Sequence, residues 1–161
     1  MEIIKITQAT DNLAQMVALF RVELRSYKGI VSQPNVDAGR EEMEEYLAAG
    51  FPVFAALLDG RYVGYLVCRV DGEVVWVESI FVKQEYRCRG IATALHSMAE
   101  EIAASYGEET VYNYVHPNNH RMIGFLRKRG YTVLNLIEIR RPYKGEKLTQ
   151  VIQVGEHQFD Y

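Results

Sequence analysis

Three apolar segments joined by two Asp-Gly pairs constrain the fold of this chain more than any other feature. In chain order these are 53–58, Asp59-Gly60, 62–70, Asp71-Gly72 and 74–82. An Asp-Gly pair favours the tight turn with positive φ that joins neighbouring antiparallel strands. The sequence therefore predicts a three-stranded antiparallel meander in the middle of the chain.

The last of these segments continues through a basic turn into a helix, over the stretch Val77 to Leu95. After Gly90, apolar residues recur with helical spacing at Ile91, Ala94, Leu95, Met98 and Ile102. The first turn of a helix has unpaired N–H groups and a partial positive charge, so it attracts anions. Arg87 and Arg89 add two charges there. The stretch indicates either a phosphate or pyrophosphate site or an ordinary turn with a solvated basic loop.

Helices and strands alternate on both sides of this centre. Further helices are expected at about 10–24, 37–49 and 119–128, and further strands at about 2–6, 110–115, 131–140 and 148–154. We find no internal repeat or linker, so we predict one domain over residues 1–161. The expected fold class is α/β (α+β), with a mixed, mainly antiparallel twisted sheet of about seven strands and about four helices.

Composition limits the classes of function. Apolar residues make up 48% of the chain and charged residues 24%, which is typical of a soluble domain. A net charge of −3 argues against a general nucleic-acid binder, and no apolar run is long enough to span a membrane. The two cysteines, Cys68 and Cys88, match no metal-ligand spacing, so no metal site is expected. The N-terminus lacks the features of a secretion signal, and we expect a cytoplasmic protein with reduced thiols.

Two motifs, in this order, make the sequence similar to the GNAT superfamily of N-acetyltransferases. The first is Arg87-Cys88-Arg89-Gly90-Ile91-Ala92, which matches the family's Gln/Arg-x-x-Gly-x-Gly/Ala fingerprint and follows Ile80-Phe81-Val82. The second is Asn119-x-x-Met122-x-x-Phe125-Leu126-x-x-x-Gly130-Tyr131, which resembles the family's Asn-x-x-Ala-x-x-Phe-Tyr-x-x-x-Gly-Phe. The resemblance extends from Glu2 to Arg140 and implies a GNAT-like sheet.

By this resemblance, the acetyl donor is acetyl-coenzyme A. Backbone N–H groups from Cys88 to Thr93 would hold its pyrophosphate, and Phe81 and Val82 would pair with its pantetheine arm. Asn119 would hydrogen-bond the same arm. The implied cofactor-binding residues are Phe81, Val82, Arg87, Cys88, Arg89, Gly90, Ile91, Ala92, Thr93, Asn119, Phe125 and Leu126.

Two residues are candidates for the chemistry of acetyl transfer. Glu78 is an acid in an otherwise apolar strand, just before the residues implied to pair with the arm, and would act as general base; a solvent-facing strand position is the alternative. The family's usual proton donor is a tyrosine at the position of Leu126, so Tyr114 is the candidate replacement. Tyr112 is expected on the same strand face, and both tyrosines are alternatively plain sheet aromatics. For His116 we expect a cap or loop role.

The expected reaction is acetyl transfer from acetyl-CoA to a primary amine of a small molecule, by direct attack in a ternary complex. Four acids of the second expected helix either attract a cationic acceptor or form a solvated face: Glu41, Glu42, Glu44 and Glu45. A protein N-terminal or lysine amine is the alternative acceptor. Leu126 motivates a third hypothesis, a non-catalytic acyl-CoA-binding domain. We expect no nucleic-acid or membrane partner, and the resemblance leads us to expect a homodimer.

Overall fold

The computed structural model describes residues 1–161, which divide into two compact units. The first unit is Met1–Phe125 and the second is Leu126–Tyr161. One domain over the whole chain stays a prediction, and the two units are described separately. None of the helices has both the length and the apolar character that crossing a lipid bilayer requires.

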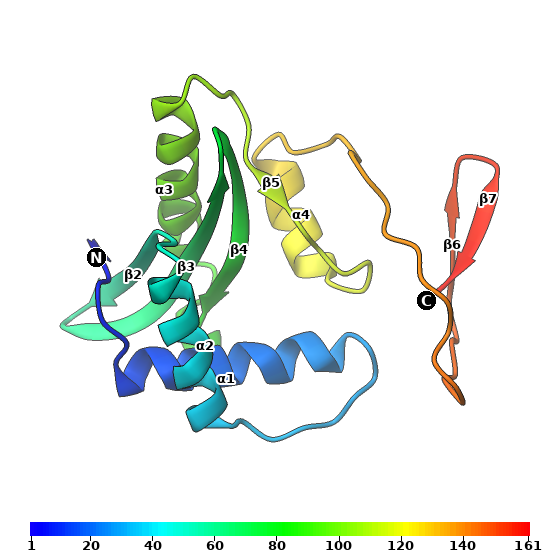
Figure 1. The fold of residues 1–161 in the computed structure, drawn as a ribbon, viewed down its shortest axis with the longest axis horizontal. Helices are drawn as coiled ribbons and strands as arrows, with labels where there is room; N and C mark the ends of the chain where they lie inside the picture. Colours follow the sequence, from blue (N-terminus) through cyan, green and yellow to red (C-terminus); the bar gives the residue numbers. More distant parts are fainter. The chain divides into compact units, whose positions relative to one another are not determined.

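The first unit is built on a five-stranded sheet in which neighbours in sequence are neighbours in space (Figure 1). Its strands are β1 (Glu2–Lys5), β2 (Val53–Leu58), β3 (Arg61–Asp71), β4 (Val74–Val82) and β5 (Tyr112–Asn113). The first four pair antiparallel, and β5 runs parallel to β4. Asp59 and Gly60 both have positive φ, at 51° and 72°, as the tight turn requires. The expected meander is therefore confirmed.

Helices cover both faces of this sheet. The helices are α1 (Asp11–Ser26), α2 (Val36–Ala48), α3 (Ile91–Ser105) and α4 (His120–Lys128), with a 3₁₀ turn η1 (Gln84–Tyr86). Leu13 and Val17 of α1 and Met43 of α2 pack in one buried cluster with Tyr65 of β3. Because side chains alternate along a strand, Gly64 faces the other way, where Leu95 of α3 lies against it. The mixed α+β class predicted from the sequence is confirmed.

Helices α1 and α2 approach each other closely at Gly39. A Cβ at that position would lie 2.3 Å from the carbonyl oxygen of Ala14, a backbone atom that cannot swing aside. Thr10 caps α1 by accepting a hydrogen bond from the Leu13 N–H at 3.4 Å. The start and the packing of α1 are thus both fixed by local chemistry.

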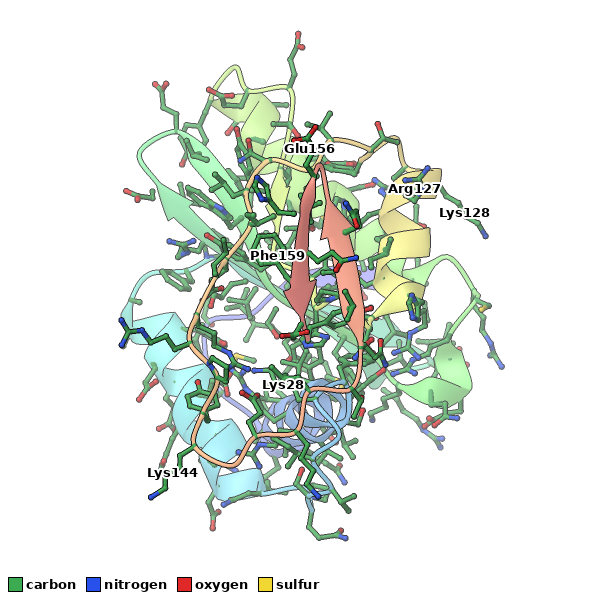
Figure 2. All side chains as sticks on the ribbon, turned by 90° about the vertical axis from the view of Figure 1, so that its right-hand side faces the viewer. Lys28, Arg127, Lys128, Lys144, Glu156 and Phe159 are labelled. Carbon is green, nitrogen blue, oxygen red and sulfur yellow. The ribbon has the colours of Figure 1, made fainter.

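The second unit holds a separate two-stranded hairpin, β6 (Val151–Val154) and β7 (His157–Asp160). Glu156 lies at its tip and Phe159 in its second strand (Figure 2). Gly155 turns the chain with φ of 60°. In the segment before the hairpin, Arg140 donates two hydrogen bonds to Glu146, at 2.9 and 2.6 Å, and closes a turn.

One strand prediction was wrong, because residues 131–140 contain no strand. The strand expected at 148–154 is present as β6 but begins only at Val151, and β7 was not predicted. In 131–140 the apolar residues come in adjacent pairs, Val133-Leu134 and Leu136-Ile137, instead of alternating, and β-propensity without a paired neighbour makes no strand. The expected sheet of about seven strands is therefore five strands plus a hairpin of two.

Candidate functional site

Strands β4 and β5 separate at Glu78. The β3–β4 register changes between the pairs Val67–Ser79 and Cys68–Val77, which leaves Glu78 as the extra residue of a β-bulge. β5 pairs with β4 only at Trp76 and Val77, so it is shorter than the strand expected over 110–115. Residues 79–82 of β4 pair with β3 on one edge, and residues 78–82 pair with no strand on the other. The N–H and C=O groups on that open edge can pair with an extended ligand.

A small pocket of about 60 Å³ lies where the two strands separate. Its lining residues are Phe20, Leu24, Val77, Glu78, Ser79, Ile80, Asn113, Tyr114, Val115, His116, Asn119 and Met122. Complete small-molecule sites usually measure about 300–1,000 Å³, so this pocket suits the reacting end of a ligand. It brings together Glu78 and Tyr114, the two expected catalytic residues, with Asn119 from the expected cofactor set.

Glu78 is held in an ion pair at the pocket. Its Oε2 lies 3.4 Å from Nε of Arg69, and both side chains are 32% exposed. The Arg69 guanidinium in turn lies 4.4 Å from the centre of the Trp76 ring. An ion pair with this exposure contributes under about 1 kcal/mol. Arg69 therefore orients the Glu78 carboxylate without preventing it from taking another partner.

Only one of the two strand tyrosines lines the pocket. Tyr114 lies just beyond β5 and its side chain is 67% exposed. The Tyr112 ring instead packs against Trp76, with 5.5 Å between ring centres. The structure thus separates a tyrosine at the pocket from one used in sheet packing.

His116 has the expected loop role, because it accepts a hydrogen bond from the backbone two residues further on, and it also lines the pocket. Its Nδ1 accepts a hydrogen bond from the Asn118 backbone N–H at 3.1 Å, so we assign the proton of the neutral ring to Nε2. Burial and the nearby charge of Lys28 lower the pKa of His116. Near neutral pH, His116 is therefore a neutral imidazole with an Nε2–H that can donate. Its place at the strand end, two residues after Tyr114, was the available sequence signal.

At its far end, β4 leads through η1 into the basic turn. Arg87 begins the fingerprint, and its side chain is directed inward: Nε donates to the Val82 carbonyl and Nη2 to Glu23, both at 2.8 Å. Arg89 stays exposed, with its guanidinium 5.6 Å from the Tyr86 ring centre. Of the two arginines expected near an anion, Arg87 supports the turn itself, whereas Arg89 remains open to solvent.

Helix α3 begins at the end of this turn with an uncapped N-terminus. Gly90 occupies the N-cap position with φ of 78°, and no side chain caps the helix. The first turn of α3 contains no acidic residue, and the N–H groups of Ile91, Ala92 and Thr93 precede the first bond of the helix. These donors fit a pyrophosphate, because nothing in the turn competes with an anion for them. Cys88, at φ of 60°, is exposed in the same turn.

The second motif lies on α4. Asn119 caps this helix, because its Oδ1 accepts from the Met122 N–H at 3.1 Å, which leaves its amide nitrogen as a donor toward a ligand carbonyl. The Phe125 ring contacts the His96 ring edge to face, with 5.6 Å between centres. Leu126 is 7% exposed, as suits an apolar side chain, and it supplies no proton donor.

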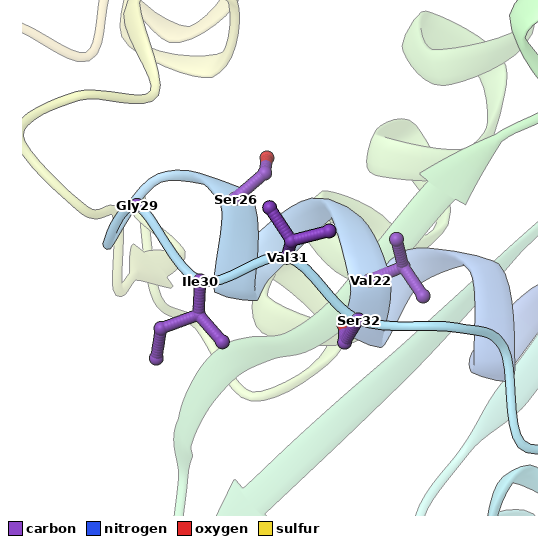
Figure 3. Close-up of a pocket in the computed structure, with 6 residues that line it drawn as sticks. All are labelled: Val22, Ser26, Gly29, Ile30, Val31 and Ser32. Atoms are coloured by element: carbon purple, nitrogen blue, oxygen red, sulfur yellow. The ribbon is translucent and has the colours of Figure 1, made fainter.

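A larger pocket, of about 280 Å³, lies beside the last turns of α1. Figure 3 shows Val22 and Ser26 on the helix and the loop residues Gly29 to Ser32 alongside them. None of its lining side chains ionises near neutral pH. The candidate catalytic residues line the smaller pocket at Glu78 instead.

Solved structures share this fold. Aminoglycoside 6'-N-acetyltransferase AAC(6')-IG from Acinetobacter haemolyticus superimposes with a TM-score of 0.63 at 19% identity, covering 89% of this chain and 99% of that one. The PaiA N-acetyltransferase from Thermoplasma acidophilum, solved in complex with coenzyme A, gives a TM-score of 0.63 at 19% identity, covering 80% of this chain and 89% of that one.

The sequence itself identifies the family. The model of the acetyltransferase (GNAT) family matches residues 16–131, well over half of the chain. The chain therefore belongs to the GNAT acetyltransferase family, and the predicted membership is confirmed.

Two curated archaeal proteins are similar in sequence. An N-alpha-acetyltransferase of Saccharolobus solfataricus is 28% identical in a 114-residue alignment that covers 61% of this chain and 65% of that protein. An uncharacterized N-acetyltransferase of Methanocaldococcus jannaschii is 32% identical in an 85-residue alignment that covers 48% of this chain and 38% of that protein. The chain thus spans less than two thirds of the length of each.

Proposed function

We propose that this protein is an acetyl-CoA-dependent N-acetyltransferase that acetylates a primary amine of a small molecule. The observation that carries the proposal is the open edge of β4, which joins the carboxylate of Glu78 to the turn before α3. The pocket for the chemistry thus lies at the start of the five-residue edge 78–82, and the donors for an anion follow the end of that edge, after η1. An extended cofactor with amides along its arm and a pyrophosphate at one end fits this edge.

In this proposal the β4 edge, the turn before α3 and Asn119 each bind a different part of acetyl-CoA. The outward N–H and C=O groups around Phe81 and Val82 pair with the pantetheine arm, although the Val82 carbonyl already accepts one bond from Arg87. The N–H groups from Cys88 to Thr93 hold the pyrophosphate, with Arg89 adding positive charge. Asn119 donates from its amide nitrogen to the arm.

When bound, acetyl-CoA supplies a thioester whose carbonyl carbon forms a bond to the amine nitrogen as its C–S bond breaks. Glu78 accepts the proton that the attacking nitrogen loses, directly or through a water. For a lysine-like amine with a pKa near 10.4, deprotonation at neutral pH costs about 4–5 kcal/mol, so a base at this place matters.

The leaving thiolate takes its proton from another group that lines the pocket. Tyr114 is the first candidate donor, and the Nε2–H of His116 is the second, because both groups line the pocket. The thiol has a pKa near 8.5 and leaves without strong acid assistance, so the loss of the family's tyrosine at Leu126 is compatible with activity.

For the acceptor, we propose a small molecule with a primary amine. Support comes from fold neighbours that act on aminoglycosides, among them AAC(6')-Iy, solved with a bisubstrate analogue of CoA and an acetylated neamine, with a TM-score of 0.59 at 20% identity, covering 88% of this chain and 97% of that one. The acidic helix α2 supports it less than expected, because Arg21 pairs with Glu42 and α2 contributes no residue to the pocket. A protein α-amino group is the second candidate, favoured by the similarity to the archaeal N-alpha-acetyltransferase.

Thiol release from acetyl-CoA tests the proposal directly. The purified protein is offered small amines, polyamines, aminoglycosides and short peptides with free N-termini, and free thiol is followed. We expect turnover with at least one small amine and less with peptides. Preference for peptides would favour the second candidate. Tight CoA binding with no thiol release for any amine would overturn the enzyme reading in favour of a binding domain.

A further inference from the structure

Glu23 contradicts the local preferences of the helix that carries it. It lies in the last turn of α1, where the partial negative charge of the helix end disfavours an acid by about 0.3–1 kcal/mol. Its side chain is nevertheless only 20% exposed. A charge placed against both the helix dipole and desolvation must be stabilised by contacts from elsewhere in the chain.

Those contacts come from two separate parts of the proposed site. Arg87, the first residue of the turn, donates from Nη2 to Glu23 Oε2 at 2.8 Å, and its own side chain is 21% exposed. Arg121, in the first turn of α4, forms an ion pair with Glu23 Oε1. The Tyr27 hydroxyl donates to the same Oε1 at 3.0 Å. One carboxylate therefore joins the end of α1, the turn before α3 and the start of α4.

The same contacts reach the pocket wall. Asn118 donates from Nδ2 to the Tyr27 carbonyl at 2.9 Å, and the Tyr27 ring stacks on His116 with 6.3 Å between centres. Arg87, for its part, also holds the Val82 carbonyl through Nε. The Glu23 carboxylate thus fixes Arg87, and Arg87 fixes both ends of the segment 82–87 on which the turn depends.

We propose that Glu23 is a positioning residue for the acetyl donor: it sets the turn over 87–93 in the geometry that binds the pyrophosphate, acting through Arg87. This inference rests on the proposed function, because it assumes that the turn binds coenzyme A. Glu23 itself touches no ligand in it. The negative charge of Glu23 itself disfavours binding of an anion. Removing that charge should therefore weaken coenzyme A binding if Glu23 positions the turn, and strengthen it if Glu23 acts only through its charge.

Glu23→Gln keeps the size of the side chain and removes the charge. If Glu23 acts through geometry, we expect the Kd for coenzyme A, measured by calorimetry, to rise about tenfold. The loss of one hydrogen bond to a charged group corresponds to a change in affinity of about this size. At saturating acetyl-CoA, kcat changes less than threefold. Glu23→Asp keeps the charge but retracts the carboxylate, and it also weakens binding.

Glu42→Gln is the matched control. Glu42 is 18% exposed, accepts hydrogen bonds from Arg21 and Tyr46, and has no contact with the turn. The Glu42→Gln substitution removes the same charge from the same unit as Glu23→Gln, and we expect its Kd for coenzyme A to stay within twofold of the wild-type value. Because Glu23 acts through Arg87, the variant Glu23→Gln/Arg87→Gln binds no more weakly than Arg87→Gln alone.

The outcomes separate the inference from the proposed function. Coenzyme A affinity that is unchanged in Glu23→Gln, with only a lower Tm, would show a purely structural carboxylate and overturn the inference. Tighter binding in Glu23→Gln with normal binding in Glu23→Asp would overturn it in favour of charge alone. A wild-type protein that binds no coenzyme A would overturn the proposed function, and the inference with it.

Discussion

The turn before α3 and the pocket at Glu78 lie at the two ends of one strand edge, yet they are built in different ways. The turn is a single contiguous segment, and its useful groups are backbone N–H donors around Gly90. The pocket is assembled from side chains of α1, β4, the segment 113–116 and the start of α4. A backbone site depends on conformation, whereas a side-chain site depends on particular functional groups. The two ends should therefore fail in different ways when mutated.

The largest effect is expected at Gly90. Any other residue at position 90 would have to adopt the left-handed backbone conformation that Gly90 has, at a cost of about 1–3 kcal/mol. Gly90→Glu also places a carboxylate beside the N–H donors of the turn. We expect the affinity for coenzyme A in calorimetry to fall by more than about a hundredfold. Gly107→Glu is the control, because Gly107 has φ of 83° with open space around it at the other end of α3. Equal loss of binding in both variants would show that strain, and not the turn, is responsible.

The next effect is expected at Glu78, and it should appear in the rate while coenzyme A affinity is kept. General bases contribute about 10²–10⁴ in rate, so Glu78→Gln should lower kcat/KM at least a hundredfold for an amine of high pKa. Weakly basic amines should lose less, because they need less help to deprotonate. Glu73→Gln, an exposed acid between β3 and β4, serves as control. An unaltered pH–rate profile in Glu78→Gln would remove Glu78 from the mechanism.

A smaller effect distinguishes the two tyrosines. Tyr114→Phe removes a hydroxyl at the pocket, and we expect kcat to fall about tenfold, since the thiolate leaves readily without an acid. Tyr112→Phe keeps the packing against Trp76 and should change kcat less than twofold. Steady-state kinetics at saturating substrates decides. Equal kinetics in the two variants would leave His116 as the remaining proton donor of the pocket.

The smallest effect is a pH dependence of stability at His116. Burial and Lys28 lower its pKa in the folded protein, so the unfolded chain takes up a proton first as the pH falls below about 6.5. The contribution of the neutral ring is complete above that pH and is lost as the pH falls toward the lowered pKa. Between about pH 7.5 and 5.5, Tm should therefore drop further in the wild type than in His116→Gln. Parallel Tm profiles of the two proteins would show that His116 does not titrate in this way.

Contiguous features of this chain were predictable from sequence. The Asp59-Gly60 turn and the strand–turn–helix around Gly90 both follow from rules that act over a few residues. The structure keeps each of them, because tertiary packing and local preference agree there. The family fingerprint lies in this part of the chain, which is why membership was readable.

Features that join distant segments were not predictable. Periodicity marks Glu78 as an outlier in β4, but it cannot show that Glu78 is a bulge against β3 or that the pairing with β5 ends just before it. Nothing near Glu23 in the sequence indicates that Arg87, 64 residues later, is its partner, although an acid in the last helical turn was a usable signal. The strand expected at 131–140 failed for the same reason, since a strand exists only with a partner.

Hydrogen–deuterium exchange with and without coenzyme A tests the central claim most directly, because it reports on backbone N–H groups along the whole edge. If the arm pairs with β4 and the pyrophosphate sits on the turn, coenzyme A slows exchange in residues 78–82 and 88–93 and leaves the pocket beside α1, at 26–32, unchanged. Protection confined to 26–32, or none within 78–93, would contradict the assignment of β4 and its turn as the site of the acetyl donor.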